Sequence, residues 1–410
     1  MSQWVDNAWT TMIVGGIVFV LAFIPGLIWQ YRKLGRVSAT RMLGWAAVCI
    51  YFSGLFAYTL LPLPENSAAF CADNAAGHNF NPMAALDDVQ RLTAGMSPVQ
   101  ALKSVVVLQL VFNVVLFVPF GVILRRYWGR GIIFTTIAGA LTSLLIETSQ
   151  YTGLFGVYPC AYRVADVDDL ILNTLGALIG AIIAPALLFW MPQAQTLSAQ
   201  KLSPRPVTVW RRWWGMALDF LAWNAVSLAI FLIAQLARYF FTDVTDTASI
   251  PLWQNLVGPI AATIAVFVLP AAGGRGSSFG QSIVWIAPKW LEPGVNKLTD
   301  GTMAKRVGRS LIMSSVLMLS SWADLLPEPA RGVVNGVTGA VLLVAVVLVP
   351  FTRTKRSLSG LLSGAYFVDA RDPRAGGVAD DVPPLLSEPD LVDLGVWKSD
   401  ERPEHVSRQR

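Results

Sequence analysis

The sequence predicts an all-α fold, a polytopic helical integral membrane protein with about nine transmembrane helices. Only 14% of its 410 residues are charged, whereas 54% are hydrophobic. Soluble proteins carry about 25% charged residues, and the mean hydropathy of this chain is +0.54. So few charges cannot cover the surface of a globule of this size. The composition therefore nearly excludes an ordinary soluble enzyme.

Apolar residues cluster into segments of bilayer length, since about 20 mostly apolar residues cross the hydrocarbon of a membrane as a helix. The first segment has neither a basic start nor a small-residue cleavage site, so it is predicted to be a span and not a signal peptide. Two segments, 255–272 and 310–326, are the weakest because they are short and contain Ser or Pro. The predicted spans are residues 10–31, 42–63, 105–124, 131–150, 169–190, 214–236, 255–272, 310–326 and 333–351.

The basic residues between these spans predict the orientation. If the N-terminus is outside, 26 of the 31 Lys and Arg residues fall on the cytoplasmic side. The positive-inside rule then favours a cytoplasmic C-terminus and an odd number of spans. Because the basic residues are spread over several short loops, contact with anionic membrane lipids accounts for them, and no nucleic-acid partner is predicted.

Composition also divides the chain. An N-terminal helix and basic loop (1–41) precede a first membrane domain (42–190), and a polar, Pro-containing cytoplasmic linker (191–209) leads to a second membrane domain (210–369). The tail, 370–410, is acidic and Pro-rich and has no helical or strand period. It is predicted to be disordered and cytoplasmic.

Two of the three cysteines fall in loops that the charge rule places outside. Cys71 and Cys160 could pair there, because disulfides persist outside the cytoplasm; two free thiols are an equally weighted alternative. Cys49 lies within the second span. His78 shares a loop with Cys71, but a single His without further ligands at metal-binding spacing is a poor metal site. No metal or cofactor is predicted.

A set of polar residues lies in or beside the third to fifth predicted spans and is here called the boundary cluster. One interpretation is a structural network in which Asp168 or Asp169 caps the fifth helix and Arg163 pairs with Glu147 or Asp166. The other is a binding site at the outer leaflet for a headgroup or for an amine or hydroxyl donor. No Ser-His-Asp or Cys-His set is present, so no catalytic residue is assigned. The boundary cluster comprises Asn113, Glu147, Gln150, Arg163, Asp166, Asp168, Asp169 and Asn173.

Small residues run down the fifth span. The pairs Gly176–Gly180 and Ala177–Ala181 are of the small-xxx-small type, which lets another membrane helix approach closely.

The pattern across these spans resembles the VanZ family over about residues 42–190. Members are membrane proteins, and the founding type is associated with low-level resistance to teicoplanin-like glycopeptide antibiotics. The resemblance implies a bacterial plasma-membrane location and a cell-envelope role, and it places the family's polar positions in the boundary cluster. The segments that carry it are Asn113-Val-Val-Leu-Phe117-Val-Pro119-Phe-Gly121, Glu147-Thr-Ser-Gln150 and Arg163-Val-Ala-Asp166-Val-Asp168-Asp169-Leu-Ile-Leu-Asn173-Thr-Leu-Gly176.

The second membrane domain contains a deep acidic residue. Arg212 and Asp219 share one helix face, with Asp219 about 10 Å deeper by helical rise. A polar packing contact and an ion or proton position on a transport path are both consistent with this pair.

The second membrane domain resembles the RDD family over roughly 205–369. The resemblance rests on Arg212 and Asp219, on the Gly-rich stretch 273–280 and on the stretch 357–368. Many of its members carry His-Asp where this chain has Ser359-Gly360. The second Asp of the family pattern is therefore missing here, which argues against transport chemistry that depends on it.

Three hypotheses follow. The first is a VanZ-like envelope protein that modulates glycopeptide susceptibility or binds lipid-linked envelope components, with membrane lipids, a cell-wall precursor or a glycopeptide as partners. The second is a small-solute or ion transporter that uses Arg212 and Asp219. The third is a non-catalytic membrane scaffold. The sequence predicts neither the ligand nor the oligomeric state.

Overall fold

The computed structural model describes residues 2–61, 63, 70–72, 77–241, 252–292 and 297–372. The predicted disordered tail falls almost entirely outside these residues. The chain separates into two compact units, Met1–Lys201 and Leu202–Arg410, and each is described by itself.

The first unit is built from long helices with short elements in its connections. The long helices are α1 (Ser2–Leu34), α2 (Ala39–Leu60), α6 (Val105–Val122), α7 (Ile132–Tyr151) and α9 (Val167–Leu187). The short elements are β1 (His78–Asn79), α4 (Ala84–Leu92), α5 (Pro98–Leu102), the π-helical turn η1 (Ile123–Tyr127), α8 (Gly153–Gly156), β2 (Ala165–Asp166) and α10 (Ala194–Ala199). The segment predicted as a linker thus contains a short helix.

Glycines set the contact between α6 and α9. A Cβ atom on Gly121 would lie 2.1 Å from the carbonyl oxygen of Ala177, and one on Gly176 would lie 2.2 Å from that of Val114. A Cβ on Gly180 would meet the carbonyl oxygen of Val118 at 2.1 Å. The two backbones therefore touch where only hydrogen atoms fit between them. The small residues of the fifth span do form the predicted close helix contact.

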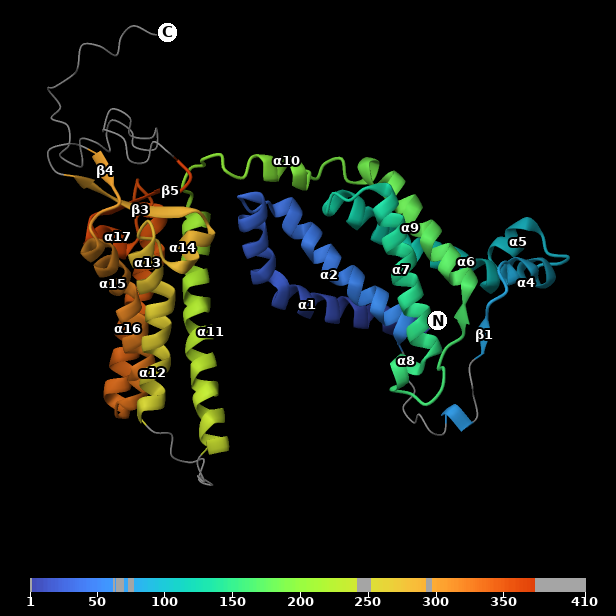
Figure 1. Ribbon diagram of the computed structural model, residues 1–410, viewed down its shortest axis with the longest axis horizontal. Helices are drawn as coiled ribbons and strands as arrows, with labels where there is room; N and C mark the ends of the chain where they lie inside the picture. The colour runs from blue at the N-terminus through green and yellow to red at the C-terminus, as the bar shows by residue number, and fades with distance from the viewer. Residues whose placement is uncertain are drawn as a thin grey trace, which may run out of the picture. The chain divides into compact units, whose positions relative to one another are not determined.

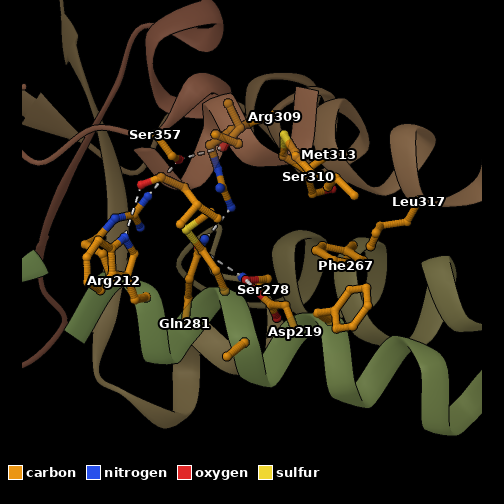
Figure 2. Close-up of a pocket in the computed structure, with 18 residues that line it drawn as sticks. Arg212, Asp219, Phe267, Ser278, Gln281, Arg309, Ser310, Met313, Leu317 and Ser357 are labelled. Carbon is orange, nitrogen blue, oxygen red and sulfur yellow. Dashed lines mark hydrogen bonds between the residues drawn. The ribbon is translucent and has the colours of Figure 1, made fainter. Parts of the chain in front are cut away.

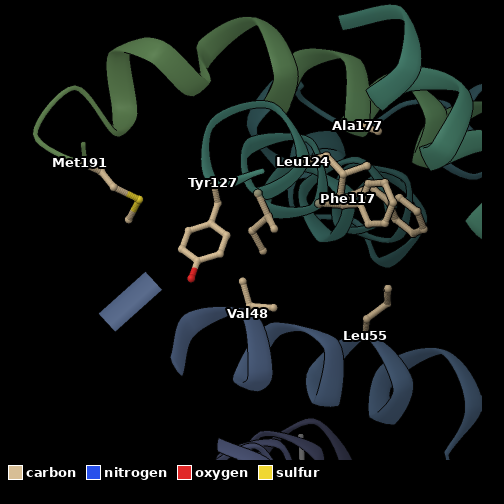
Figure 3. Close-up of a cluster of buried hydrophobic side chains, with 9 residues drawn as sticks. Val48, Leu55, Phe117, Leu124, Tyr127, Ala177 and Met191 are labelled. Carbon is tan, nitrogen blue, oxygen red and sulfur yellow. The ribbon is translucent and has the colours of Figure 1, made fainter. Parts of the chain in front are cut away.

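A buried cluster joins this helix pair to α2 (Figure 3). Val48 and Leu55 of α2 face Phe117 of α6 and Tyr127 of η1. At its edge, the fully buried Arg41 donates to the carbonyl oxygen of Tyr127 at 2.7 Å, and its guanidinium lies 4.3 Å from the centre of the Tyr127 ring. The Tyr127 hydroxyl donates to the carbonyl oxygen of Arg41 at 3.0 Å. The basic residue at the start of α2 is thus part of the packing.

In the second unit, long helices run side by side, and a small sheet lies at one end of them (Figure 1). The long helices are α11 (Val209–Phe241), α12 (Leu252–Thr263) with its π-helical continuation η2 (Ile264–Val268), α15 (Met303–Trp322) and α16 (Glu328–Phe351). Shorter elements are α13 (Leu269–Gly273), α14 (Phe279–Ile283), the 3₁₀ turn η3 (Ala323–Leu325) and α17 (Leu358–Ser363).

The sheet is antiparallel with strand order β4-β3-β5. Its strands are β3 (Ile286–Glu292), β4 (Lys297–Thr299) and β5 (Ala365–Asp369). The register pairs Ile286 with Asp369. All five residues of β5 are buried, so the chain segment that follows the last long helix returns into the unit. The sequence predicted no strand here, because a short, fully buried strand has no alternating pattern.

The prediction of a polytopic helical membrane protein is confirmed. Among the described residues, eight helices are long and apolar enough to cross a membrane. The predicted span 310–326 is not among them and falls on α15, whose early turns contain Lys305, Arg306 and Arg309. An even number of spans would place both termini on one side, so the outside N-terminus stays a prediction. The eight are Thr11–Leu34, Ala39–Leu60, Val105–Tyr127, Ile132–Tyr151, Val167–Leu187, Val209–Phe240, Asn255–Gly273 and Glu328–Phe351.

Candidate functional site

The boundary cluster is assembled by α6, by the C-terminal end of α7, by the first turns of α9 and by the loop before α9. The segment before α4 pairs with the segment before α9 through β1 and β2, with Asn79 opposite Asp166. Cys71 and Cys160 form a disulfide with Cα atoms 5.7 Å apart, across a sequence separation of 89 residues. The strand pair and the disulfide hold the loop before α4 against the loop that leads into α9.

Asp166 caps α9. Its side chain accepts a hydrogen bond from the backbone nitrogen of Asp168 at 2.9 Å and bonds from Nδ2 of Asn79 at 3.2 Å. We expected Asp168 or Asp169 to be the cap, and this expectation is wrong. Asp168 instead accepts from the backbone nitrogens of Met83 at 2.7 Å and Ala85 at 2.8 Å. Asp168 therefore anchors the start of α4.

Glu147 and Asp169 lie near each other, one from α7 and one from the first turn of α9. Oε2 of Glu147 accepts from the backbone nitrogen of Asp166 at 2.9 Å. Asp169 accepts a hydrogen bond from Nδ2 of Asn113 on α6. Glu147 is 9% exposed and Asp169 is partly buried. The donors to both carboxylates are neutral.

Arg163 does not pair with Glu147 or Asp166 as the structural interpretation expected. Its Nη1 donates to the carbonyl oxygens of Tyr58 at 3.2 Å and Thr59 at 3.1 Å, and its Nη2 donates to that of Leu61. A cation is favourable at the carboxyl end of a helix, where carbonyl groups lack partners. Arg163 therefore closes the C-terminal end of α2.

Two further members of the boundary cluster tie helices together. Nε2 of Gln150 donates to the carbonyl oxygen of Thr59 at 2.8 Å, and Nδ2 of Asn173 donates to Oγ of Ser143 at 2.9 Å. Neither Ser143 nor Asn79 was predicted, since uncharged Ser and Asn are common in helices and loops.

The carboxylates of the boundary cluster lack basic partners. Its four carboxylates, on Glu147, Asp166, Asp168 and Asp169, form no ion pair with any basic residue that the structure describes. Within the same residues, no group of His, Cys, Asp and Glu is arranged to hold a metal ion. The arrangement suits a ligand that donates hydrogen bonds or carries positive charge.

In the second unit, Arg212 and Asp219 have separate partners. Oδ2 of Asp219 accepts from Oγ of Ser278 at 2.5 Å and Oδ1 from the backbone nitrogen of Gly280 at 2.6 Å. Nη2 of Arg212 donates to Oγ of Ser357 at 2.9 Å. Asp219 therefore holds the start of α14 on α11. This contact favours the packing interpretation of Asp219 over a transport position.

A cavity of about 500 Å³ opens beside these residues, here called the arginine cavity. It is lined by Arg212, Asp219, Ser278, Gln281, Arg309 and Ser359, among others (Figure 2). From the sequence, Arg309 is predicted to lie in a loop, because the predicted span begins one residue later. In the structure Arg309 lies on α15 and is 3% exposed.

Asp369, the last residue of β5, is a further buried charge that was not predicted. It is 2% exposed and forms ion pairs with Arg211 at 2.8 Å and Arg371 at 2.6 Å. Burial by itself would raise the pKa of Asp369, but hydrogen bonds from Arg371 and the charge of Arg211 hold that pKa below its usual value. The sequence signal was a single Asp that ends the apolar run Ala365-Tyr-Phe-Val.

Part of the first unit matches a known protein family. The VanZ/LLP1 family model matches residues 48–190. No match was found among curated proteins or among solved structures. The matched stretch contains every residue of the boundary cluster. The chain is thus a polytopic helical membrane protein with a VanZ-like segment.

Proposed function

We propose that this chain is a VanZ-like cell-envelope protein that binds an envelope ligand through the boundary cluster. The ligand would carry an amine or several hydroxyl groups, as a glycopeptide of the teicoplanin type or a lipid-linked wall component does. By binding it at the outer leaflet, the protein would modulate susceptibility to glycopeptide antibiotics. The family match over residues 48–190 supports the envelope role.

The observation that carries this proposal is that the carboxyl groups of Glu147 and Asp169 have no cationic partner among the described residues. Glu147 accepts a hydrogen bond from a backbone amide, and Asp169 accepts one from the Asn113 side chain. Carboxylates removed from water normally pair with cations, because desolvation of an unpaired charge is costly. Arg163, the nearest basic residue in sequence, is engaged by the end of α2. A cationic or hydroxyl-rich ligand would supply the missing partner.

The test removes each charge and keeps the shape. Glu147→Gln and Asp169→Asn should abolish the change in glycopeptide susceptibility that expression of the wild-type chain produces. Asp88→Asn is the matched control, because Asp88 is an exposed carboxylate of α4 paired with Arg91 at 2.7 Å, outside the boundary cluster. The control should behave as wild type.

Binding should be measured alongside susceptibility. Purified wild-type protein should retain an amine-bearing glycopeptide more tightly than its N-acylated derivative, and Glu147→Gln should lose this preference. If both variants insert and fold normally yet leave susceptibility and binding unchanged, the proposed site is wrong. If instead every variant, together with Arg163→Gln, loses folding without a separable binding defect, the scaffold hypothesis is favoured.

A further inference from the structure

The arginine cavity has a polar end and an apolar wall. At the polar end, Arg212 comes from α11 and Arg309 from α15; Gln281 accepts from Arg309, and Ser278 lies beside Asp219 (Figure 2). The wall is formed by Phe267, Met313 and Leu317 and by further apolar side chains of α11 and α16. Its volume of about 500 Å³ falls within the range of about 300–1,000 Å³ that is typical of ligand sites.

The polar end carries more positive than negative charge. Arg212 is 1% exposed and Arg309 is 3% exposed, and a guanidinium keeps its proton in proteins. Asp219 is the single carboxylate that lines the cavity. Neither arginine forms an ion pair within 4.0 Å of a carboxylate that the structure describes. The two arginines and Asp219 together therefore leave one positive charge without a negative counterpart.

The guanidinium groups also have donors to spare. Nη2 of Arg309 donates to the carbonyl oxygen of Gly276 at 2.6 Å and to Oε1 of Gln281 at 3.3 Å. Nε of Arg309, and Nε and Nη1 of Arg212, are buried and have no hydrogen-bond partner in the described part of the chain. Buried donors are rarely left unpaired, since each costs about 1–3 kcal/mol.

Aromatic stacking holds both arginines in place. The guanidinium of Arg212 lies 3.4 Å from the centre of the Phe367 ring, and that of Arg309 lies 5.7 Å from it. Phe367 belongs to β5, so the buried strand fixes the two cations at the polar end. A fixed pair of guanidinium groups suits the oxygens of a carboxylate or phosphate.

We propose that the arginine cavity binds an anionic amphiphile. Its acidic group would lie between Arg212 and Arg309, and its hydrocarbon chain would lie along Phe267, Met313 and Leu317. The acidic group supplies the missing negative charge and acceptors, and the chain fills an apolar space. A free fatty acid and an anionic phospholipid share this chemistry. This site is independent of the boundary cluster, so its test can fail while the proposed function stands.

The experiment uses the delipidated, purified full chain in a neutral detergent. The probes are oleate and dioleoyl phosphatidic acid, with oleyl alcohol and dioleoyl phosphatidylcholine as their less acidic counterparts, and binding is measured by native mass spectrometry and equilibrium dialysis. We expect an acidic probe to bind at least about tenfold more tightly than its counterpart, as charge-assisted hydrogen bonds imply. Preference for oleate would identify a fatty acid, and preference for phosphatidic acid would identify a phospholipid.

Variants locate the binding. Arg309→Gln should lower the affinity for the preferred probe at least about tenfold. Arg306→Gln is the matched control, because Arg306 lies on the same helix but donates to Gly274 and does not line the cavity. Ala217→Phe should also abolish binding by filling the cavity without changing a charge. It serves as the second test if Arg309→Gln does not fold.

Two results would overturn the inference. One is equal binding of acidic and less acidic probes to the wild-type protein. The other is an affinity of a folded Arg309→Gln or Ala217→Phe protein equal to that of Arg306→Gln.

Discussion

The contact between α6 and α9 predicts that Gly180 cannot accept even one methyl group. A Cβ atom there would lie 2.1 Å from the carbonyl oxygen of Val118, whereas ordinary contact begins at 3.4 Å. The helices would have to separate by about 1.3 Å, because the obstacle is backbone and not a flexible side chain. Overpacking of this kind costs about 1–3 kcal/mol.

Alanine also has a compensating benefit. It is favoured over glycine within a helix by about 0.5–1 kcal/mol. We therefore expect Gly180→Ala to lower the free energy of unfolding of the first unit by about 1 kcal/mol, the difference between the middle values of these two effects. Gly16→Ala on α1 is the matched control, because nothing lies within 4 Å of a Cβ there. The control should leave stability unchanged or raise it slightly.

Cys49 offers a reporter for the first unit. It is the free cysteine of the chain and is 6% exposed within the buried face of α2. Purified protein would be unfolded by increasing dodecyl sulfate in dodecyl maltoside micelles, and Cys49 would be labelled with a maleimide by a short pulse at each step. The Gly180→Ala midpoint should shift to lower dodecyl sulfate. A midpoint equal to or above that of Gly16→Ala would refute the close-contact argument.

Two further predictions concern a disulfide and a buried acid. Reduction of the Cys71–Cys160 bond, or Cys71→Ser, should lower the stability of the first unit by about 2–4 kcal/mol, since the bond closes a long loop; thermal melting with and without reductant checks this, and an unchanged midpoint would contradict it. Because the folded pKa of Asp369 lies below its unfolded value, its contribution to stability is present above about pH 4 and is lost as the pH falls through the folded pKa. Asp369→Asn should therefore be clearly less stable than wild type at pH 7, and the difference should vanish under strong acid; a difference independent of pH would count against the ion pairs with Arg211 and Arg371.

The sequence predicted the features that depend on neighbours along the chain. Hydropathy over about 20 residues located eight of the spans, because the bilayer imposes a length on each helix separately. The spacing of Gly176 and Gly180 predicted a close helix contact, since both glycines fall on one face of α9. The order of polar residues in 113–173 carried the family resemblance that the match over 48–190 supports.

Tertiary structure decided which polar groups meet. Asp166 and not Asp168 caps α9, and Arg163 reaches carbonyl groups about 100 residues earlier in the chain. These partners depend on how α2, α4 and α9 pack together, and nothing in the local sequence encodes those contacts.

The burial of Arg309 and Asp369 was likewise decided only in three dimensions. Hydropathy placed Arg309 in a loop, but α15 packs against α12 and α16 and brings it into the arginine cavity. Asp369 is buried because β5 joins the sheet beside β3. A charge can be buried when distant elements supply its partners. The sequence therefore determined which helices are long and apolar enough to cross a membrane, and the packing of distant helices and strands determined which of the described charges are buried and what partners they have.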